Sequence, residues 1–264
     1  MVLPARKVAL VTGSATGAGR AIALRFAGNG YAVAVNYSRS EAEARQTFED
    51  VQNLGVPAIL CKATVADDKQ VRAMVDRCWG ELGGLDVLVN NAGFGAASPF
   101  EAIPMATVRE LFETNVFGTM AVTQAVLPQF RQRRAGVVVN VTSSVTLKSL
   151  PLIASYTASK AAVNAFTESM ALELQQFGVR ARLVLPGRSP ETRFGENAQS
   201  RRQGLDHEAY ADLVKSLFAR FAAPGPITHA LDVAEAVWRA ATDPLSPMRI
   251  PAGADAEAWA AEAR

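Results

Sequence analysis

The segment V-A-L-V-T-G-S-A-T-G-A-G, residues 8–19, decides the fold that this sequence predicts. Val8 to Val11 form a short apolar run that is typical of a buried strand. The glycines follow at once, and apolar side chains then recur with helical spacing over residues 21–27, until Gly28-Asn29-Gly30 ends the pattern. In this strand, turn and helix context a glycine motif predicts a phosphate site. Glycine lets the backbone approach a pyrophosphate, and the helix N-terminus presents free N–H groups.

Strands and helices alternate along the rest of the chain. Apolar runs predict further strands at 32–37, 58–61, 87–89, 137–141 and 183–185, and helical patterns lie at 40–54, 67–82, 105–134 and 156–177. This alternation predicts an α/β fold whose parallel sheet is covered by helices on both faces. Ligands of such sheets bind at the carboxyl ends of strands. Thr12, Asn91 and Ser143 all fall at such ends, which predicts one site there.

The composition is that of an ordinary globular protein. The chain has 264 residues, of which 49% are hydrophobic and 20% charged, with a net charge of +2. We find no linker-like tract and no internal repeat, so a single domain over residues 1–264 is expected. No apolar run approaches the roughly 18 residues that a membrane span needs, and the N-terminal run is too short for a signal peptide. We therefore expect no membrane association.

Cysteine, histidine and basic residues exclude several classes of site. Cys61 and Cys78 have neither metal-ligand nor disulfide-framework spacing, which fits a reduced, cytoplasmic setting. His207 and His229 stand apart from any ligand cluster, so no metal site is expected. The basic run at 131–134 lies at a predicted helix end, where the helix dipole favours cations, and we expect no nucleic-acid partner.

Residues 137–160 carry the candidate chemistry. Ser143 follows the predicted strand, and Tyr156 and Lys160 lie one helical turn apart, so their side chains share a helix face. A free phenol loses its proton near pH ~10, and a nearby cation lowers that value. The pair therefore predicts an acid/base group, with the Ser143 hydroxyl near the same substrate oxygen. Most Tyr-x-x-x-Lys pairs are ordinary helix surface, so this prediction depends on a cofactor site elsewhere.

The end of the second predicted strand bears on the cofactor. The strand leads into Asn36-Tyr37-Ser38-Arg39, with no carboxylate before Glu41. An acidic residue in this region binds the ribose 2′-OH of NAD, whereas arginine accommodates the 2′-phosphate of NADP. The sequence therefore favours NADP(H), with NAD(H) possible. The alternative is that Arg39 only begins a solvated helix.

Six motifs in order resemble the short-chain dehydrogenase/reductase family. They are T-G-x-x-x-G-x-G at 12–19, N-N-A-G at 90–93, Asn115, Ser143, Y-x-x-x-K at 156–160 and P-G at 186–187. The resemblance implies a Rossmann-type doubly wound sheet of about seven strands in the order 3-2-1-4-5-6-7. It also implies hydride transfer between a nicotinamide and a carbonyl or secondary alcohol.

The resemblance also implies roles for individual residues. Tyr156 would be the general acid, Lys160 would lower its pKa and bind the nicotinamide ribose, Ser143 would polarise the carbonyl, and Asn115 would hold a relay water. Pro186 and Gly187 would flank the nicotinamide amide. The full cofactor-binding set that it implies is Gly13, Ala15, Thr16, Gly17, Ala18, Tyr37, Ser38, Arg39, Thr64, Val65, Asn91, Ala92, Gly93, Tyr156, Lys160, Pro186 and Gly187.

The chain departs from the family pattern at several positions. Thr64 stands where an aspartate commonly reads the adenine amino group, and Ala18 replaces a bulkier aliphatic residue. Thr192 lies one residue beyond the common spacing from P-G, which leaves its contact with the carboxamide open. The tail R-I-P-A-G-A-D-A, residues 249–256, lacks the glycine-rich ending of fatty-acid-synthesis ketoreductases and argues against that activity.

Residues 188–228 are expected to form the substrate lid, and the substrate itself is not named by the sequence. Arginines in and near it could attract an anion or simply be solvated, and apolar residues could line a pocket or pack the lid. The family commonly forms homodimers or homotetramers, with which apolar residues of the Asn115 and Tyr156 helices are compatible. These three sets are Arg188, Arg193, Arg201 and Arg202; Phe94, Phe194, Leu213, Leu217 and Phe218; and Val122, Val126, Val163 and Phe166.

The sequence thus predicts an NADP(H)-dependent carbonyl reductase or alcohol dehydrogenase with a small-molecule substrate. One alternative is an NAD-dependent dehydrogenase that works oxidatively. The other is a dinucleotide-binding sensor without turnover, against which the complete set of Asn115, Ser143, Tyr156 and Lys160 argues.

Overall fold

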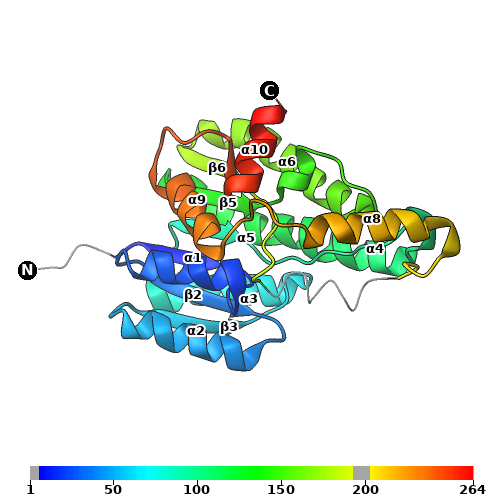
Figure 1. Ribbon diagram of the computed structural model, residues 1–264. Helices are drawn as coiled ribbons and strands as arrows, with labels where there is room; N and C mark the ends of the chain where they lie inside the picture. Colours follow the sequence, from blue (N-terminus) through cyan, green and yellow to red (C-terminus); the bar gives the residue numbers. More distant parts are fainter. Residues whose placement is uncertain (1–5, 193–202, 264) are drawn as a thin grey trace, which may run out of the picture.

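The computed structural model describes residues 6–192 and 203–263 and contains a seven-stranded parallel sheet (Figure 1). Its strand order is β3-β2-β1-β4-β5-β6-β7, so the predicted fold class and strand order are confirmed. The strands are β1 Val8–Val11, β2 Ala32–Tyr37, β3 Ala58–Lys62, β4 Val87–Asn90, β5 Gly136–Val141, β6 Val179–Pro186 and β7 Arg249–Ala252.

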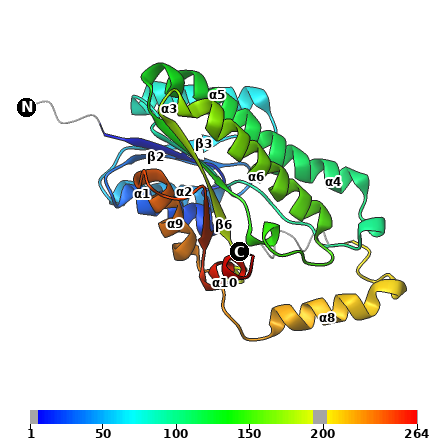
Figure 2. The same ribbon diagram turned by 90° about the horizontal axis from the view of Figure 1, so that it is seen from above.

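Helices cover both faces of this sheet, as Figure 2 shows from above. One layer holds α1 Gly17–Ala27, α2 Glu41–Asn53 and α9 Ala230–Thr242; the other holds α3 Asp68–Leu82, α5 Thr119–Arg133 and α6 Ala154–Gln175. Alternate residues of a strand point to opposite faces. In β1, Ala9 and Val11 accordingly pack with α1 and α9, whereas Val8 and Leu10 pack with α3 and α5. All four positions are therefore apolar and buried.

The prediction of one continuous α-helix over 105–134 is wrong in one detail, because a π-helical turn interrupts it. It consists of α4 Met105–Phe112, a π-helical turn η2 Glu113–Gly118, and α5. The wider turn coincides with Asn115, whose side chain bonds the backbone of Phe94 in another loop. Such π-helical turns are frequent at functional sites.

Asp86 fastens the amino-terminal edge of the sheet. Its carboxylate accepts the backbone N–H of Val8 at 2.8 Å and pairs with Arg133 at 2.7 Å, at the end of α5. Its backbone N–H and C=O bond Val8 and Val137, which lie at the start of neighbouring strands. These contacts lie at the edge opposite the carboxyl ends of the strands.

The remaining elements follow β4, β5, β6 and β7. Between 188 and 228 the structure describes a short turn η4 Glu208–Tyr210 and α8 Ala211–Ala222, which projects from the body (Figure 2). Arg193, Phe194, Arg201 and Arg202 lie outside the described residues. The chain closes with α10 Ala254–Glu262, and short 3₁₀ turns are η1 Phe100–Ala102 and η3 Ser144–Thr146. Within residues 6–192 and 203–263, no helix is long and apolar enough to cross a bilayer.

Candidate active site

The glycine turn after β1 requires its glycines. Gly13 and Gly17 have positive φ angles of 63° and 56°, which L-residues rarely adopt. A Cβ at Gly13 would lie 2.9 Å from the Cα of Ala92, and one at Gly19 would collide with the Gly13 carbonyl oxygen. The turn therefore packs too closely against itself and the loop after β4 for any side chain.

The N-terminus of α1 opens at this turn without a side-chain cap. Thr16 occupies the N-cap position but makes no capping hydrogen bond, and the first turn carries no acidic residue. Free N–H groups and the positive end of the helix dipole together form a site suited to a phosphate. These residues fit the pyrophosphate of a dinucleotide.

Buried polar side chains hold the turn in place. Asn36 accepts the Gly13 N–H at 3.1 Å, while its amide group donates to the carbonyl oxygens of Cys61 and Ala63. Thr12 accepts the N–H groups of Asn91 and Ala92 at 3.0 Å each. The sequence prediction did not include Asn36, although a polar residue near the end of an apolar strand was the available signal.

A pocket of about 680 Å³ lies over the turn and collects the predicted adenosine and phosphate residues. It also contains Lys62, Gln70, Thr114 and Thr192, which sequence reasoning did not assign or left open. Gln70 accepts the Thr64 N–H at 3.0 Å and so supports the segment where the family aspartate is missing. The predicted residues that line the pocket are Gly13, Ala15, Thr16, Gly17, Ala18, Tyr37, Ser38, Arg39, Thr64, Val65, Asn91, Ala92 and Gly93.

Two cationic side chains, Arg39 and Lys62, lie on the wall of the pocket near the ends of β2 and β3. Arg39 and Ser38 are exposed there, and Lys62 lies 3.6 Å from Glu41. Glu41 also bonds Arg45 at 2.7 Å, and these two basic partners lower the pKa of its carboxyl group. The one carboxylate in this ion-pair group is therefore compensated, and the wall is suited to an anion.

The four predicted catalytic side chains are buried and come from the loop after β5, from α6 and from η2. Ser143 follows β5, Tyr156 and Lys160 lie in the first two turns of α6, and Asn115 lies in η2. Lys160 donates to the carbonyl oxygen of Val141 at 3.0 Å. Burial lowers the pKa of its ammonium group to about 8, because desolvation disfavours the charged form.

The Tyr156 phenol shows the opposite of the expected shift. Burial raises its pKa to about 12, and a hydrogen bond with Ser143 only partly opposes this. The Lys160 nitrogen lies 6.0 Å from the centre of the phenol ring and is itself desolvated. Burial therefore determines the net direction of the shift, and the role of Lys160 in lowering the phenol pKa stays a prediction. Tyr156 is protonated at neutral pH, as a proton donor must be.

Asn115 fixes the relative position of three segments. Its carbonyl oxygen accepts the Phe94 N–H at 3.0 Å, and its amide donates to the Phe94 carbonyl at 2.9 Å and to Ser159 at 3.2 Å. Its backbone carbonyl accepts the Thr119 hydroxyl at 2.9 Å. The side chain thus joins η2 to α6 and the loop after β4, and its predicted role with a relay water stays a prediction.

Gly93 connects the cofactor pocket with the catalytic group. A Cβ at Gly93 would lie 2.9 Å from the Asn115 side-chain oxygen and 3.5 Å from the Lys160 nitrogen. Gly93 also lines the pocket over the glycine turn. Pro186 and Gly187 lie at the end of β6, which is two strands from β4 in the sheet order. They do not line the pocket over the glycine turn.

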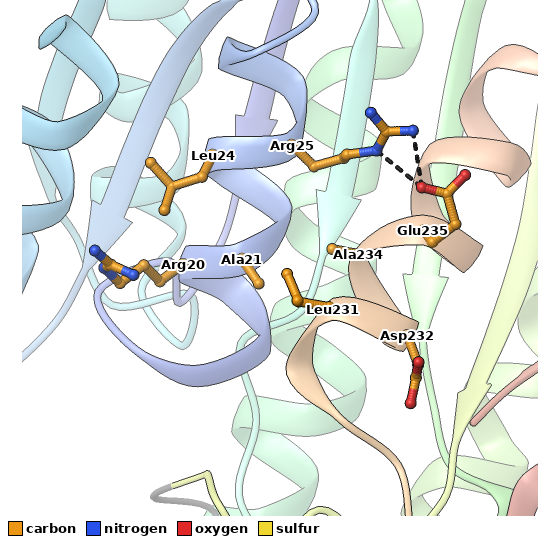
Figure 3. A pocket seen from close by; sticks show the side chains of 8 residues that line it. All are labelled: Arg20, Ala21, Leu24, Arg25, Leu231, Asp232, Ala234 and Glu235. Atoms are coloured by element: carbon orange, nitrogen blue, oxygen red, sulfur yellow. Dashed lines mark hydrogen bonds and ion pairs between the residues drawn. The ribbon is translucent and has the colours of Figure 1, made fainter. Parts of the chain in front are cut away.

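A second pocket, of about 570 Å³, lies between α1 and α9 (Figure 3). Side chains of the two helices face each other across it, and Arg25 pairs with Glu235 at 2.8 Å. It contains none of the predicted catalytic residues. Within residues 6–192 and 203–263, no group of three or more His, Cys, Asp or Glu could hold a metal ion.

The fold and the site together define a nucleotide-binding α/β oxidoreductase. The sequence profile of the short chain dehydrogenase family matches residues 7–203, and the chain belongs to this family. It is 38% identical to a 3-oxoacyl-(acyl-carrier-protein) reductase of Staphylococcus aureus over 181 residues, which are 69% of this chain and 74% of the relative. It is 34% identical to the 7alpha-hydroxysteroid dehydrogenase of Escherichia coli K12, over 69% of this chain and 70% of that one.

Solved structures agree over nearly the whole chain. A short-chain dehydrogenase from Streptomyces avermitilis superimposes with a TM-score of 0.84 at 30% identity, covering 98% of this chain and 92% of the other. An NAD⁺-bound xylitol dehydrogenase gives a TM-score of 0.78 at 26% identity, covering 95% and 99%.

The contacts of Gly19 predict that Gly19→Ala weakens dinucleotide binding. The added methyl group would collide with the Gly13 carbonyl and displace the turn, so we expect the Kd to rise at least about tenfold, the effect of losing one or two hydrogen bonds to a charged group. The control is Gly80→Ala in α3, where a methyl group meets nothing within 4 Å. Titration of cofactor fluorescence measures both, and unchanged affinity in Gly19→Ala would contradict the assignment.

Proposed function

We propose that this protein is an NADP(H)-dependent oxidoreductase that transfers a hydride between the nicotinamide and a carbonyl or secondary alcohol. One observation carries the proposal: Gly93, which lines the pocket over the glycine turn, lies against Asn115 and Lys160. Lys160 in turn lies beside Tyr156, which hydrogen-bonds with Ser143. Family membership supports the same reaction class.

In carbonyl reduction the cofactor supplies the hydride, and the protein supplies orientation and the proton. The Tyr156 hydroxyl gives its proton to the substrate oxygen as the carbonyl carbon becomes tetrahedral, and the phenolate that remains is reprotonated from solvent. Ser143 bonds Tyr156, and in the proposed reaction its hydroxyl turns to donate to the same substrate oxygen. The Lys160 ammonium stabilises the phenolate once it forms. In alcohol oxidation the same steps run in reverse, with the phenolate as the base.

The preference for NADP(H) is supported by the charge of the pocket wall. Arg39 and Lys62 flank the end of β2, where a 2′-phosphate would lie, and Tyr37 replaces a carboxylate there. One structural relative, the xylitol dehydrogenase, is NAD⁺-bound, which keeps an NAD-dependent oxidative enzyme as the second candidate.

The substrate is proposed to be a small carbonyl compound or alcohol with apolar substituents. Tyr156 belongs to an apolar cluster with Ala96, Ile103 and Leu111, against which Phe94 packs. Among the relatives, one is a 3-oxoacyl reductase and one a hydroxysteroid dehydrogenase. We place the activity in the cytoplasm, which suits two buried, unpaired thiols.

Self-association as a homodimer or homotetramer is part of the proposal, but not through the residues first considered. Val122, Val126 and Val163 are buried within one chain, and Phe166 packs against the same core. The surface of η2 and α6 instead exposes other large apolar side chains, Phe117 at 52% and Leu172 at 74%. Each of these exposed side chains offers apolar area to a second copy.

Tyr156→Phe tests the proposed reaction. Removal of the hydroxyl removes the proton donor while keeping the buried ring, so we expect kcat to fall by about 10²-fold or more with NADPH binding retained. Nicotinamide absorbance with a panel of ketoesters, cyclic ketones, quinones and steroids measures it. Tight binding with no turnover of any carbonyl, or of alcohols with oxidised cofactor, would favour the sensor alternative.

Arg39→Ala tests the cofactor preference. Loss of the guanidinium removes a charge-assisted bond to the 2′-phosphate, so we expect the NADPH KM to rise about tenfold and the NADH KM to stay unchanged. Arg72→Ala in α3 is the control, because Arg72 is exposed and does not line the pocket. Equal effects of Arg39→Ala on both cofactors would refute NADP(H) specificity.

The pH dependence of kcat/KM tests the two shifted groups. The profile reports the free enzyme, in which Lys160 has a pKa of about 8 and Tyr156 of about 12. Lys160 is charged below about pH 8 and loses its proton above it, whereas Tyr156 stays protonated. Carbonyl reduction should therefore decline as the pH rises through about 8, and a rate that stays flat to pH ~10, the unperturbed range of lysine, would contradict this.

A further inference from the structure

The loop that follows β6 is held by side chains from the C-terminal part of the chain. Gly187 donates its N–H to the Thr228 hydroxyl at 3.0 Å, and Arg188 donates its N–H to the Asp255 carboxylate at 2.6 Å. The Thr228 N–H returns a bond to the Arg188 carbonyl at 2.8 Å. Two consecutive peptide units of this loop are therefore fixed by residues that are distant in sequence.

Asp255 is a buried carboxylate with both oxygens engaged. One accepts the Arg188 N–H, and the other accepts the Thr228 hydroxyl at 2.6 Å. The side chain is 8% exposed, and Thr228 is fully buried. Asp255 lies in the first turn of α10, where the helix dipole favours a negative charge. Hydrogen bonds and the dipole thus stabilise a charge that burial alone would disfavour.

The same carboxylate touches Gly187 directly. A Cβ at Gly187 would collide with both Asp255 oxygens, so glycine is required there by this contact. The sequence shows Pro-Gly at 186–187 but not why the glycine is needed. Asp255 was likewise not singled out, because 67 residues separate it from Arg188 and no local pattern connects them.

Helix α10 also reaches the loop that carries Ser143. Lys148, in the loop after η3, pairs with Glu262 at 2.6 Å and lies over the Trp259 ring at 5.6 Å. Helix α10 also contacts η3, the turn that follows Ser143. Figure 2 shows α10 beside the end of β6 and the loop after β5. One helix therefore contacts both loops that border the proposed reaction centre.

We propose that Asp255 is a positioning residue that fixes the Gly187–Arg188 backbone for the nicotinamide half of the cofactor. The inference rests on the proposed function, in which Pro186 and Gly187 flank the nicotinamide amide. Asp255 acts through the loop and does not touch the substrate. The adenosine half lies over the glycine turn, four strands away from β7 in the sheet order. Loss of Asp255 therefore affects one half of the cofactor site.

Binding of the whole cofactor and of its adenosine half separates this role from a general loss of stability. In Asp255→Ala the Kd of NADPH rises about tenfold, because two hydrogen bonds to a carboxylate are lost, whereas the Kd of adenosine 2′,5′-bisphosphate stays at the wild-type value. Isothermal titration calorimetry measures both. Asp86→Ala is the matched control: it removes a carboxylate that also binds a backbone N–H, at the opposite sheet edge. It should lower the unfolding midpoint and leave both Kd values unchanged.

Asp255→Asn and Thr228→Val keep the test decisive if Asp255→Ala does not fold. In Asp255→Asn the side-chain oxygen still accepts the Arg188 N–H, while the Thr228 hydroxyl turns its proton to the Ala252 carbonyl at 2.8 Å. This variant should therefore retain most NADPH affinity. Thr228→Val removes the bonds to Gly187 and Asp255 and should show the selective loss of NADPH affinity.

The outcomes are distinguishable. Selective weakening of NADPH in Asp255→Ala or Thr228→Val supports the inference. Equal weakening of NADPH and the bisphosphate, or no change in either, overturns it while the proposed function stands. If the wild-type protein binds NADH and AMP but neither NADPH nor the bisphosphate, the same comparison is made with NADH and AMP. Only the NADP(H) preference is then refuted. Binding of neither dinucleotide overturns both proposals.

Discussion

The parallel register of the central strands is the constraint on which the site depends. β1, β2, β4, β5 and β6 all run in one direction, so the residues that follow them meet at one edge of the sheet. The glycine turn, the N-N-A-G loop, Ser143 and Pro186-Gly187 are far apart in sequence and adjacent there. A shift in the register of one strand would separate them, and buried side chains on both faces resist such a shift.

Burial shifts the pKa values of the two titratable catalytic groups in opposite directions. It raises the pKa of Tyr156 and lowers that of Lys160, because a desolvated site disfavours the charged form of each group. The raised pKa keeps Tyr156 protonated at neutral pH but makes the phenol a weaker acid, so transfer of its proton costs more free energy. The Ser143 hydrogen bond favours the phenolate and so moderates the cost of that transfer.

Much of the fold could be predicted because its signals are local. Apolar runs identify the strands, and the glycine turn directly follows one of them. The parts that could not be predicted depend on contacts between distant residues. The π-helical turn forms where Asn115 bonds Phe94, and Lys62 reaches the cofactor pocket only because β3 pairs with β2. The pKa of Tyr156 was expected to fall because spacing shows a nearby cation but not the extent of burial. Asp255 bonds a backbone group 67 residues away, and such a contact leaves no local pattern in the sequence.

The cofactor is easier to assign than the substrate because the two are expected to contact different parts of the chain. The pyrophosphate region consists of backbone N–H groups and glycines, whose contacts are nearly the same for any dinucleotide. Cofactor preference then depends on a few side chains at the ends of β2 and β3, which a short stretch of sequence displays. The proposed substrate region instead consists of residues from the loop after β4 and from α4, which are distant in sequence from Tyr156 and pack around it. The loop after β6 leads into the 188–228 segment, so the Asp255 contact that is proposed to order the nicotinamide region also fixes the point at which this segment leaves the sheet.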